Sequence, residues 1–236
     1  MFNSDAKGFF SKVFGVLAFF LIFAVFSVGI QPVVLIVPFS IALLWLTYAC
    51  VDCAYRNESF SKYAALRLYS GLGLAPLLAF VCTLAAADKG SQLSPVASVA
   101  VSCVPFVICG AAYVVVYSWP IKKKSLEVHG QRVEVIGDDF GKRSSLLFAG
   151  VTTVLSSVLY SVFRLHGSPV LVLVLFFVAL SLFFVFHCRV DIASLKALKI
   201  REAREGCHYT FMNIEEIREK RAASLLGRLF SSKNVL

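Results

Sequence analysis

The stretch VLVLVLFFVALSLFFVF (residues 170–186) contains no charged residue, and its single polar side chain is Ser181. A helix needs about 20 predominantly apolar residues to cross the roughly 30 Å hydrocarbon core of a bilayer. The stretch is close to that length, so it predicts a transmembrane helix. A short turn containing Arg164 precedes it, and a basic tail, residues 187–236, follows it.

Five more apolar stretches precede this one, and the chain as a whole is 58% apolar with a mean hydropathy of +0.80. Short polar connections or turn residues such as Gln31-Pro32 separate them. The predicted fold is therefore an all-α polytopic membrane protein with six transmembrane helices in three hairpins. A shallow hairpin that does not cross the bilayer is an alternative for the first two stretches. The predicted spans are residues 13–30, 33–51, 68–87, 96–119, 146–163 and 170–186.

Positive charge lies almost entirely on one side of this predicted arrangement. Of the 23 Lys and Arg residues, all except Lys89 and Arg164 fall on the side of the two chain ends. Loops rich in Lys and Arg stay in the cytoplasm, so both ends are expected inside, with a bacterial inner membrane as the favoured location. The net charge of +9 is then explained by topology and by attraction to anionic lipid headgroups. Nucleic-acid binding is not expected, because the sequence shows no surface that combines aromatic and basic residues in the usual way.

The chain divides into a membrane domain, residues 1–188, and a basic helical tail, residues 189–236. The membrane domain includes a connection, residues 120–145, that is long enough to fold. Within it, polar and apolar residues alternate on both sides of Gly130, which predicts a small β-hairpin over residues 125–136. A two-stranded hairpin is only marginally stable in water, so we expect it to pack against another part of the chain.

The tail is predicted to form two amphipathic helices. The first ends near Gly206, and the second begins at Asn213, which is followed by Glu216 at the spacing of a capping box. These helices could lie on the membrane surface, cover the hairpin or bind a partner. A protein partner on the cytoplasmic side is favoured, and a homo-oligomer is left open. The cationic side chains expected to bind the partner are Arg218, Lys220 and Arg221.

Small residues recur every four positions in two of the predicted spans. Small side chains at this spacing let helix backbones approach closely, and dispersion forces between them drive association in lipid. The pattern therefore predicts helix contacts, and a polar pathway along the second set is the alternative. The two sets are Gly71, Ala75, Ala79 and Thr83, and Ala149, Thr153, Ser157 and Ser161.

No sequence motif names a reaction, and neither a catalytic residue nor a cofactor nor a metal is predicted. The sequence lacks a Gly-rich phosphate loop, a nucleophile elbow and an H-E-x-x-H helix. Cys and His residues gather at the predicted cytoplasmic boundary, where a zinc site is conceivable, but a single C-x-x-C without a second spaced pair is a weak signal. These residues are Cys50, Cys53, His187, Cys188, Cys207 and His208.

Three classes of function remain open at this point. The favoured class is a non-catalytic interaction or accessory protein, such as a component of a secretion or conjugation apparatus, or an exclusion or immunity factor. The second is a channel or uncoupled permease for a small solute, with its pathway along the second small-residue set. Ion-coupled transport is disfavoured, because the predicted spans carry no charge at mid-depth of the kind that coupling needs. The third is an enzyme acting on lipid, with Asp138 and Asp139 as its site.

Overall fold

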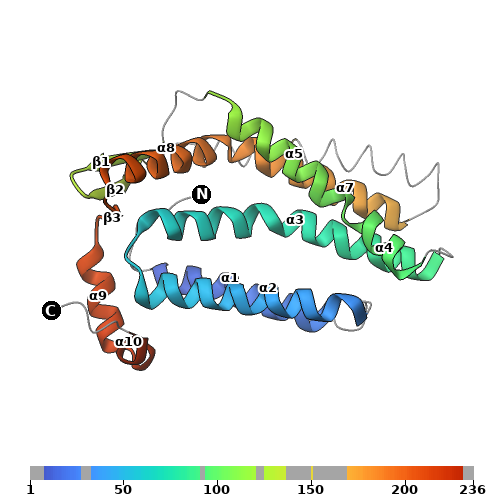
Figure 1. Cartoon of the computed structure of the whole chain (residues 1–236), viewed down its shortest axis with the longest axis horizontal. Coiled ribbons are helices and arrows are strands. Elements are labelled where there is room, and N and C mark those ends of the chain that lie inside the picture. Colours follow the sequence, from blue (N-terminus) through green and yellow to red (C-terminus); the bar gives the residue numbers. More distant parts are fainter. Residues whose placement is uncertain are drawn as a thin grey trace.

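The computed structural model of the chain describes residues 8–27, 33–90, 94–120, 125–136, 150 and 169–230. Long helices make up most of these residues, and one small sheet lies at one end of them (Figure 1). This confirms a mostly helical fold with a small β-structure. We refer to that end of the molecule as the sheet end.

Most helices run along the long axis of the molecule, while the last two lie across the sheet end (Figure 1). The strands are β1 (Leu126–His129), β2 (Arg132–Val135) and β3 (Thr210–Phe211). The helices are α1 (Phe9–Ser27), α2 (Val33–Val51), the π-helix η2 (Asp52–Arg56), α3 (Phe60–Gly90), α4 (Pro95–Ser102), α5 (Val104–Ser118), α7 (Pro169–His187), α8 (Arg189–Glu205), α9 (Ile214–Ala223) and α10 (Leu225–Phe230).

Among the described residues, three helical stretches are long and apolar enough to cross a bilayer, namely Leu35–Arg56 (α2 with η2), Phe60–Ala85 (within α3) and Val96–Ser118 (α4 with α5). Leu171–His187 and Arg189–Glu205 would together make a fourth span, bent by 53° at the break between them. The apolar helix Phe9–Val25 is shorter. Length and composition are thus compatible with a membrane protein. The span predicted at residues 146–163 lies, apart from residue 150, outside the described part of the chain.

Three of the helices differ from the predicted spans. α1 begins at Phe9 and not at residue 13. α3 begins at Phe60 and not at residue 68, because Phe60 and Tyr63 are buried at the sheet end. The single helix predicted over residues 96–119 is interrupted at Cys103, which separates α4 from α5. Pro105 lies in the first turn of α5, where its missing amide hydrogen removes no helix hydrogen bond.

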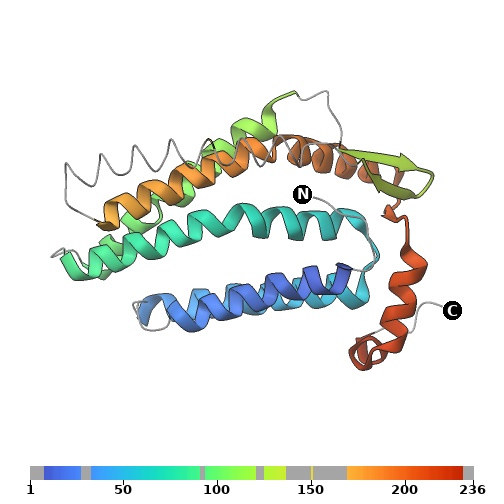
Figure 2. The ribbon, with the colours of Figure 1, turned by 180° about the vertical axis from the view of Figure 1, so that it is seen from behind.

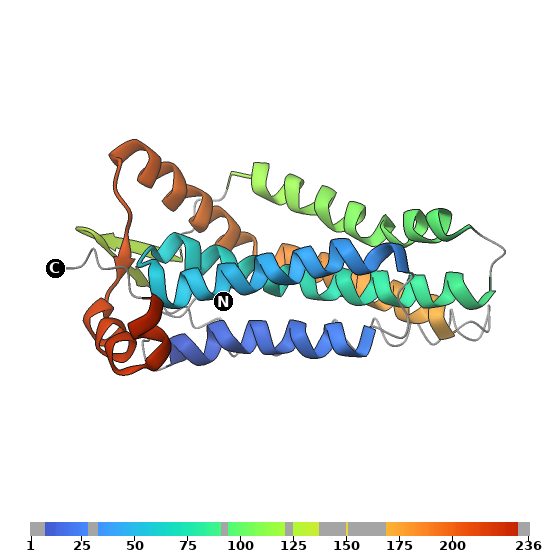
Figure 3. The same ribbon diagram turned by 60° about the horizontal axis from the view of Figure 1, so that its bottom comes forward.

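α3 lies in the middle of the molecule and packs most extensively on α7, with α4 and α5 also against it (Figures 2 and 3). α1 and α2 form an adjacent pair that touches α3 less. Large apolar side chains are exposed on the outward faces, for example Leu44 and Trp45 of α2 and Val107 of α5. Water-soluble proteins rarely expose so much apolar surface, whereas lipid tails solvate it.

A buried apolar cluster extends from these helices into the sheet end. Phe211 of β3 is central to it, with its ring centroid 5.3 Å from that of Phe9 and 5.2 Å from that of Phe60. The ring of Tyr63 lies 5.3 Å from that of Phe211. Edge-to-face pairs contribute about 0.5–1.5 kcal/mol each beyond their burial. Aromatic packing therefore joins the tail to α1 and α3.

The predicted β-hairpin is confirmed. β1 and β2 pair antiparallel, with His129 opposite Arg132. Gly130 is the first of the two loop residues and has a φ of +61°, and Gly is favoured where a two-residue hairpin turn needs positive φ at that position. The hairpin also has the additional partner that it was expected to need, because β3 of the tail pairs parallel to β2 with Thr210 opposite Arg132.

The tail forms helical segments as predicted, with differences at their ends. α7 ends at His187 and α8 begins at Arg189, with a bend of 53° between them; the division into two domains at this point stays a prediction. α8 ends at Glu205, and the Gly206 that follows has a φ of +64°, the left-handed conformation that terminates many helices. α9 begins after Asn213, but the Asn213 side chain makes no capping hydrogen bond, so that half of the predicted capping box is not formed. Ser224 then separates α9 from α10.

Candidate functional site

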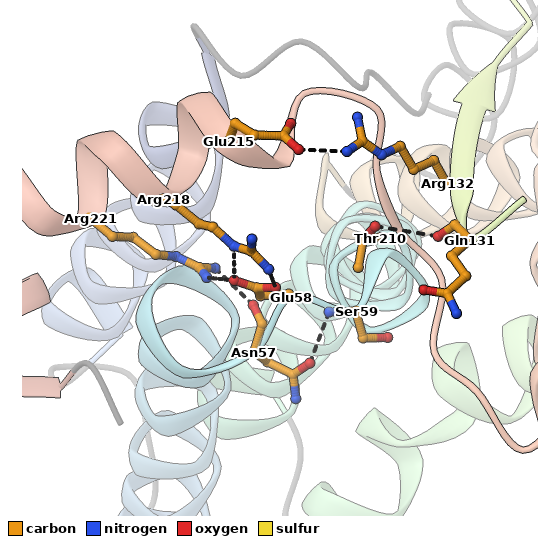
Figure 4. Close-up of polar contacts among 9 residues, drawn as sticks. All are labelled: Asn57, Glu58, Ser59, Gln131, Arg132, Thr210, Glu215, Arg218 and Arg221. Carbon is orange, nitrogen blue, oxygen red and sulfur yellow. Dashed lines mark hydrogen bonds and ion pairs between the residues drawn. The ribbon is translucent and has the colours of Figure 1, made fainter. Parts of the chain in front are cut away.

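Charged and polar residues from three parts of the chain meet at the sheet end. They come from the loop after η2, from β2 and from α9, which are far apart in the sequence (Figure 4). The cluster ties the tail to the connection between η2 and α3. We call it the tail junction, and it consists of Asn57, Glu58, Arg132, Glu215, Arg218 and Arg221.

The loop that positions Glu58 follows from the local sequence. Asn57 ends η2 in extended conformation, with φ −117° and ψ 138°. Its side-chain oxygen accepts a hydrogen bond from the Ser59 amide at 2.9 Å, a local turn that Asn favours. The Phe60 amide donates to the Tyr209 carbonyl at 2.8 Å. The tail thereby satisfies one of the amides that the first turn of α3 leaves without a helical partner.

Arg218 and Glu58 form a two-pronged ion pair between α9 and this loop. Arg218 Nε donates to Oε1 at 2.8 Å, and Arg218 Nη2 donates to Oε2 at 2.6 Å. Two parallel hydrogen bonds are the strongest arrangement of an arginine and a carboxylate. The hydrogen bonds from Arg218 hold the pKa of Glu58 below its ordinary value, and those from Glu58 hold the pKa of Arg218 above its own.

Arg221 is the buried member of the tail junction, with 7% of its surface exposed. Its guanidinium donates to the carbonyl oxygens of Ala54 at 2.6 Å, Asn57 at 2.7 Å and Cys53 at 3.2 Å. These carbonyls lie at the C-terminal end of η2, where a cation is favoured and helical donors are missing. Burial lowers the pKa of Arg221 from its ordinary value, but guanidinium groups stay charged in proteins. Glu58 Oε1, 3.8 Å from Arg221 Nη1, offsets part of this charge.

A second ion pair joins the sheet to α9. Arg132 Nη2 donates to Glu215 Oε1 at 2.5 Å, and Arg132 Nη1 donates to the Met212 carbonyl at 3.0 Å. Glu215 lies in the first turn of α9, and a backbone hydrogen bond lowers the pKa of its carboxyl. Both side chains are well exposed, so water screens this pair strongly. Its main effect is to orient α9 relative to β2.

The three cations expected to bind a partner all lie on α9, and the structure places two of them in the tail junction. Arg218 and Arg221 contact the chain itself, while Lys220 Nζ pairs with Glu216 at 2.8 Å, one turn earlier. Sequence reasoning missed Glu58 and Arg132. The one available signal was an acidic residue in a short connection on the same predicted side as a strongly cationic tail.

The small-residue set of α3 is partly buried. Ala75 and Ala79 are buried, and the Thr83 hydroxyl donates to the Ala79 carbonyl at 2.8 Å. Gly71 lines a groove between α1 and α3. A pathway along the second small-residue set, or an enzyme site in the loop before it, stays a prediction. The residues concerned lie outside the described ranges: Asp138, Asp139, Ala149, Thr153, Ser157 and Ser161.

In the described part of the chain, no three His, Cys, Asp or Glu side chains form a group that could hold a metal ion. Cys50, Cys53 and Cys188 are buried and Cys207 is half-buried, all as free thiols. The Cys and His residues of the predicted boundary therefore do not gather into one such group there. The tail junction, which is made of ion pairs and carbonyl contacts, is suited to holding two parts of a chain together.

Comparisons with protein-family models, with curated proteins and with solved structures found no match for this chain. The structure itself therefore defines the class: over its described residues, the chain is mostly helical, with three candidate membrane-spanning helices and a small sheet. The tail junction adds a feature that length and composition do not imply, a basic tail that is docked on the end of those helices.

Proposed function

We propose that the chain is an integral membrane protein with six spans and both ends in the cytoplasm, and that it docks a protein partner through its sheet end. The partner would bind the surface that the tail junction builds from the loop at residues 57–59, β2 and α9. The role is non-catalytic. A component of a secretion or conjugation apparatus, or an exclusion or immunity factor, would use such a surface.

The observation that carries this proposal is the buried contact of Arg221. Burying a charge costs free energy unless hydrogen bonds compensate it, and here three carbonyls do so. A tail that only attracted anionic lipid would need no such contact. The contact supports a single position for the tail, and a preformed surface loses little entropy when it binds a partner.

α9 is the element best placed to meet the partner. It buries Ile214, Ile217 and Arg221 along one side. Its other side exposes Glu219 and Ala222. This exposed side, bordered by the ion pairs of the tail junction, is the proposed contact surface.

A charge swap tests the proposal. The full-length tagged chain is extracted from its host in a mild detergent, and copurifying proteins are identified by mass spectrometry. Glu58→Arg and Arg218→Glu each bring like charges together, so both variants should release the tail and lose the partner. The double variant restores an opposite pair at these two positions and should recover part of the association, because Arg221 then lacks the carboxylate that offsets its charge. Arg204→Glu, at an exposed arginine of α8 outside the tail junction, is the matched control and should leave association unchanged.

The outcomes separate the function classes. If proteolysis shows that the tail is released in both single variants but the partner still copurifies, the sheet end is not the docking surface. A single homo-oligomer without a second protein would instead favour a channel or uncoupled permease for a small solute. Flux into liposomes would then be the measurement to make.

A further inference from the structure

A groove opens between α1 and α3, next to the sheet end, with a cavity volume of about 230 Å³. Gly15 and Phe19 line it from α1, and Arg67, Gly71 and Leu74 line it from α3. Gly15 helps to keep it open, because a Cβ added there would meet no atom within 4 Å. The walls are mostly apolar, and Arg67 is the charged group of the groove.

Arg67 has few partners within the described residues. Its Nη1 donates to the Lys12 carbonyl at 3.5 Å, which is beyond the usual length of a hydrogen bond. None of the ion pairs formed in the described ranges involves it. The Lys12 ammonium lies 3.1 Å from the position that a Cβ would occupy on Gly8, one turn earlier in the chain. The Lys12 side chain therefore extends toward the sheet end and not into the groove. Most donors of Arg67 are therefore available to an acceptor from outside the chain.

We infer that this groove binds one anionic phospholipid from the leaflet that faces the sheet end. The phosphate would lie on Arg67, since a guanidinium matches the oxygens of a phosphate with paired hydrogen bonds. An acyl chain would lie along Phe19 and Leu74. Ile22, one turn beyond Phe19, is also exposed, so apolar surface continues in the direction of the bilayer centre.

Charge complementarity selects this occupant over others. An arginine near the end of a membrane helix can extend its guanidinium to the level of the lipid headgroups, and basic pockets between membrane helices bind anionic headgroups. A soluble anion could pair with Arg67 but would leave the apolar walls unfilled. The inference uses the membrane placement of the proposed function but not the docking role of the tail, so the two ideas fail in different experiments.

Native mass spectrometry of the full-length chain in detergent tests the inference. Phosphatidylglycerol and phosphatidylcholine are added in equal amounts, and the retained lipid is counted. We expect about a fivefold preference for phosphatidylglycerol, since one cation near an anionic headgroup contributes about 1 kcal/mol. Arg67→Gln should abolish the preference. Arg56→Gln, which removes an exposed cation outside the groove, is the matched control and should keep it.

Shape is tested separately from charge. Gly15→Leu fills the groove and leaves Arg67 in place, so it should reduce the retained phosphatidylglycerol at least as much as Arg67→Gln does. If the Arg67→Gln variant fails to fold, the phosphatidylglycerol retained by the Gly15→Leu variant tests the inference by itself. Equal retention of the two lipids by the unaltered chain, or an unchanged preference in either groove variant, would overturn the inference. Competition by glycerol 3-phosphate as strong as that by the lipid would overturn the lipid as occupant.

Discussion

Arg221 and Glu58 hold the tail in different ways, although both lie in the tail junction. Arg221 satisfies carbonyl oxygens that have no helical donor, and it does so in a buried position. Glu58 forms its ion pair with Arg218 nearer to water, where exchange with solvent weakens the interaction. Arg221 is therefore expected to contribute more to tail docking than Arg218.

Replacement of Arg221 by methionine keeps an apolar stem of similar length but removes every donor. The carbonyls of Ala54 and Asn57 lose their partner, and each unsatisfied buried group costs about 1–3 kcal/mol. We expect Arg221→Met to weaken tail docking by about 2–4 kcal/mol, measured as faster thermolysin cleavage within the tail. Arg204→Met is the control. Equal protection of the two variants would contradict the role assigned to Arg221.

Glu58 makes tail docking sensitive to acid. Its pKa in the folded chain is lowered from the ordinary value of 4.5, chiefly by the hydrogen bonds from Arg218, with the charge of Arg221 adding to the effect; burial of the carboxyl and, less, the charge of Glu215 oppose it. A lowered pKa stabilises the docked state at pH values above 4.5 and loses this effect as the pH falls through the folded pKa. We expect proteolytic protection of the tail to be constant from pH 7 to 5 and to fall below that.

Glu58→Gln supplies the control for this pH dependence. Glutamine cannot titrate, so the variant should be less protected than the original chain at pH 7, with a smaller loss on acidification. An identical acid profile in the two chains would assign the transition to other carboxylates, such as Glu215, whose pKa is also lowered.

At the scale of elements, the tail is built from short pieces that are stabilised by what they contact. β3 consists of two residues and pairs with β2, and α10 is a helix of six residues. Isolated segments of this length do not form stable structure. The turn between α9 and α10 depends on a close approach, because a Cβ at Gly227 would lie 1.8 Å from the Arg221 carbonyl oxygen.

Gly227→Ala tests this turn. The neighbouring atom belongs to the backbone, so the clash cannot be relieved by a side-chain rotation, and overpacking of this kind costs about 1–3 kcal/mol. We expect faster amide hydrogen exchange in α10 and in the last turn of α9. Gly15→Ala, where the added methyl group meets no atom within 4 Å, should leave exchange in the tail unchanged. Unaltered exchange in Gly227→Ala would mean that the turn has another conformation in solution.

At the scale of the whole molecule, the hairpin strands, the tail helices and the first turn of α1 gather at the sheet end (Figures 1 and 3). The contact between Phe9 and Phe211 shows this directly. The arrangement agrees with one condition of the proposed topology, which is that these segments share one side of the membrane.

Thiol labelling measures this topology. In a variant without its native cysteines, Glu134→Cys in β2 and Glu219→Cys in α9 should react with a membrane-impermeant maleimide only after the cells are opened. Gln92→Cys, in the connection between α3 and α4, should react in intact cells. Labelling of the first two positions in intact cells would invert the proposed topology, and labelling of all three would argue against a membrane-spanning arrangement.

The sequence by itself determined the mostly helical fold, the apolar helices of membrane length and the β-hairpin around Gly130. These features depend on residues that are neighbours along the chain, since apolar length, alternation and a turn glycine act locally. Tertiary structure alone decided the partner strand of the hairpin, the burial of Arg221 and the groove at Arg67. Arg218 and Glu58 are separated by 160 positions, and no local pattern specifies which carboxylate a distant arginine will meet. That choice depends on how the helices pack, because packing sets which polar groups lose water and must find a partner.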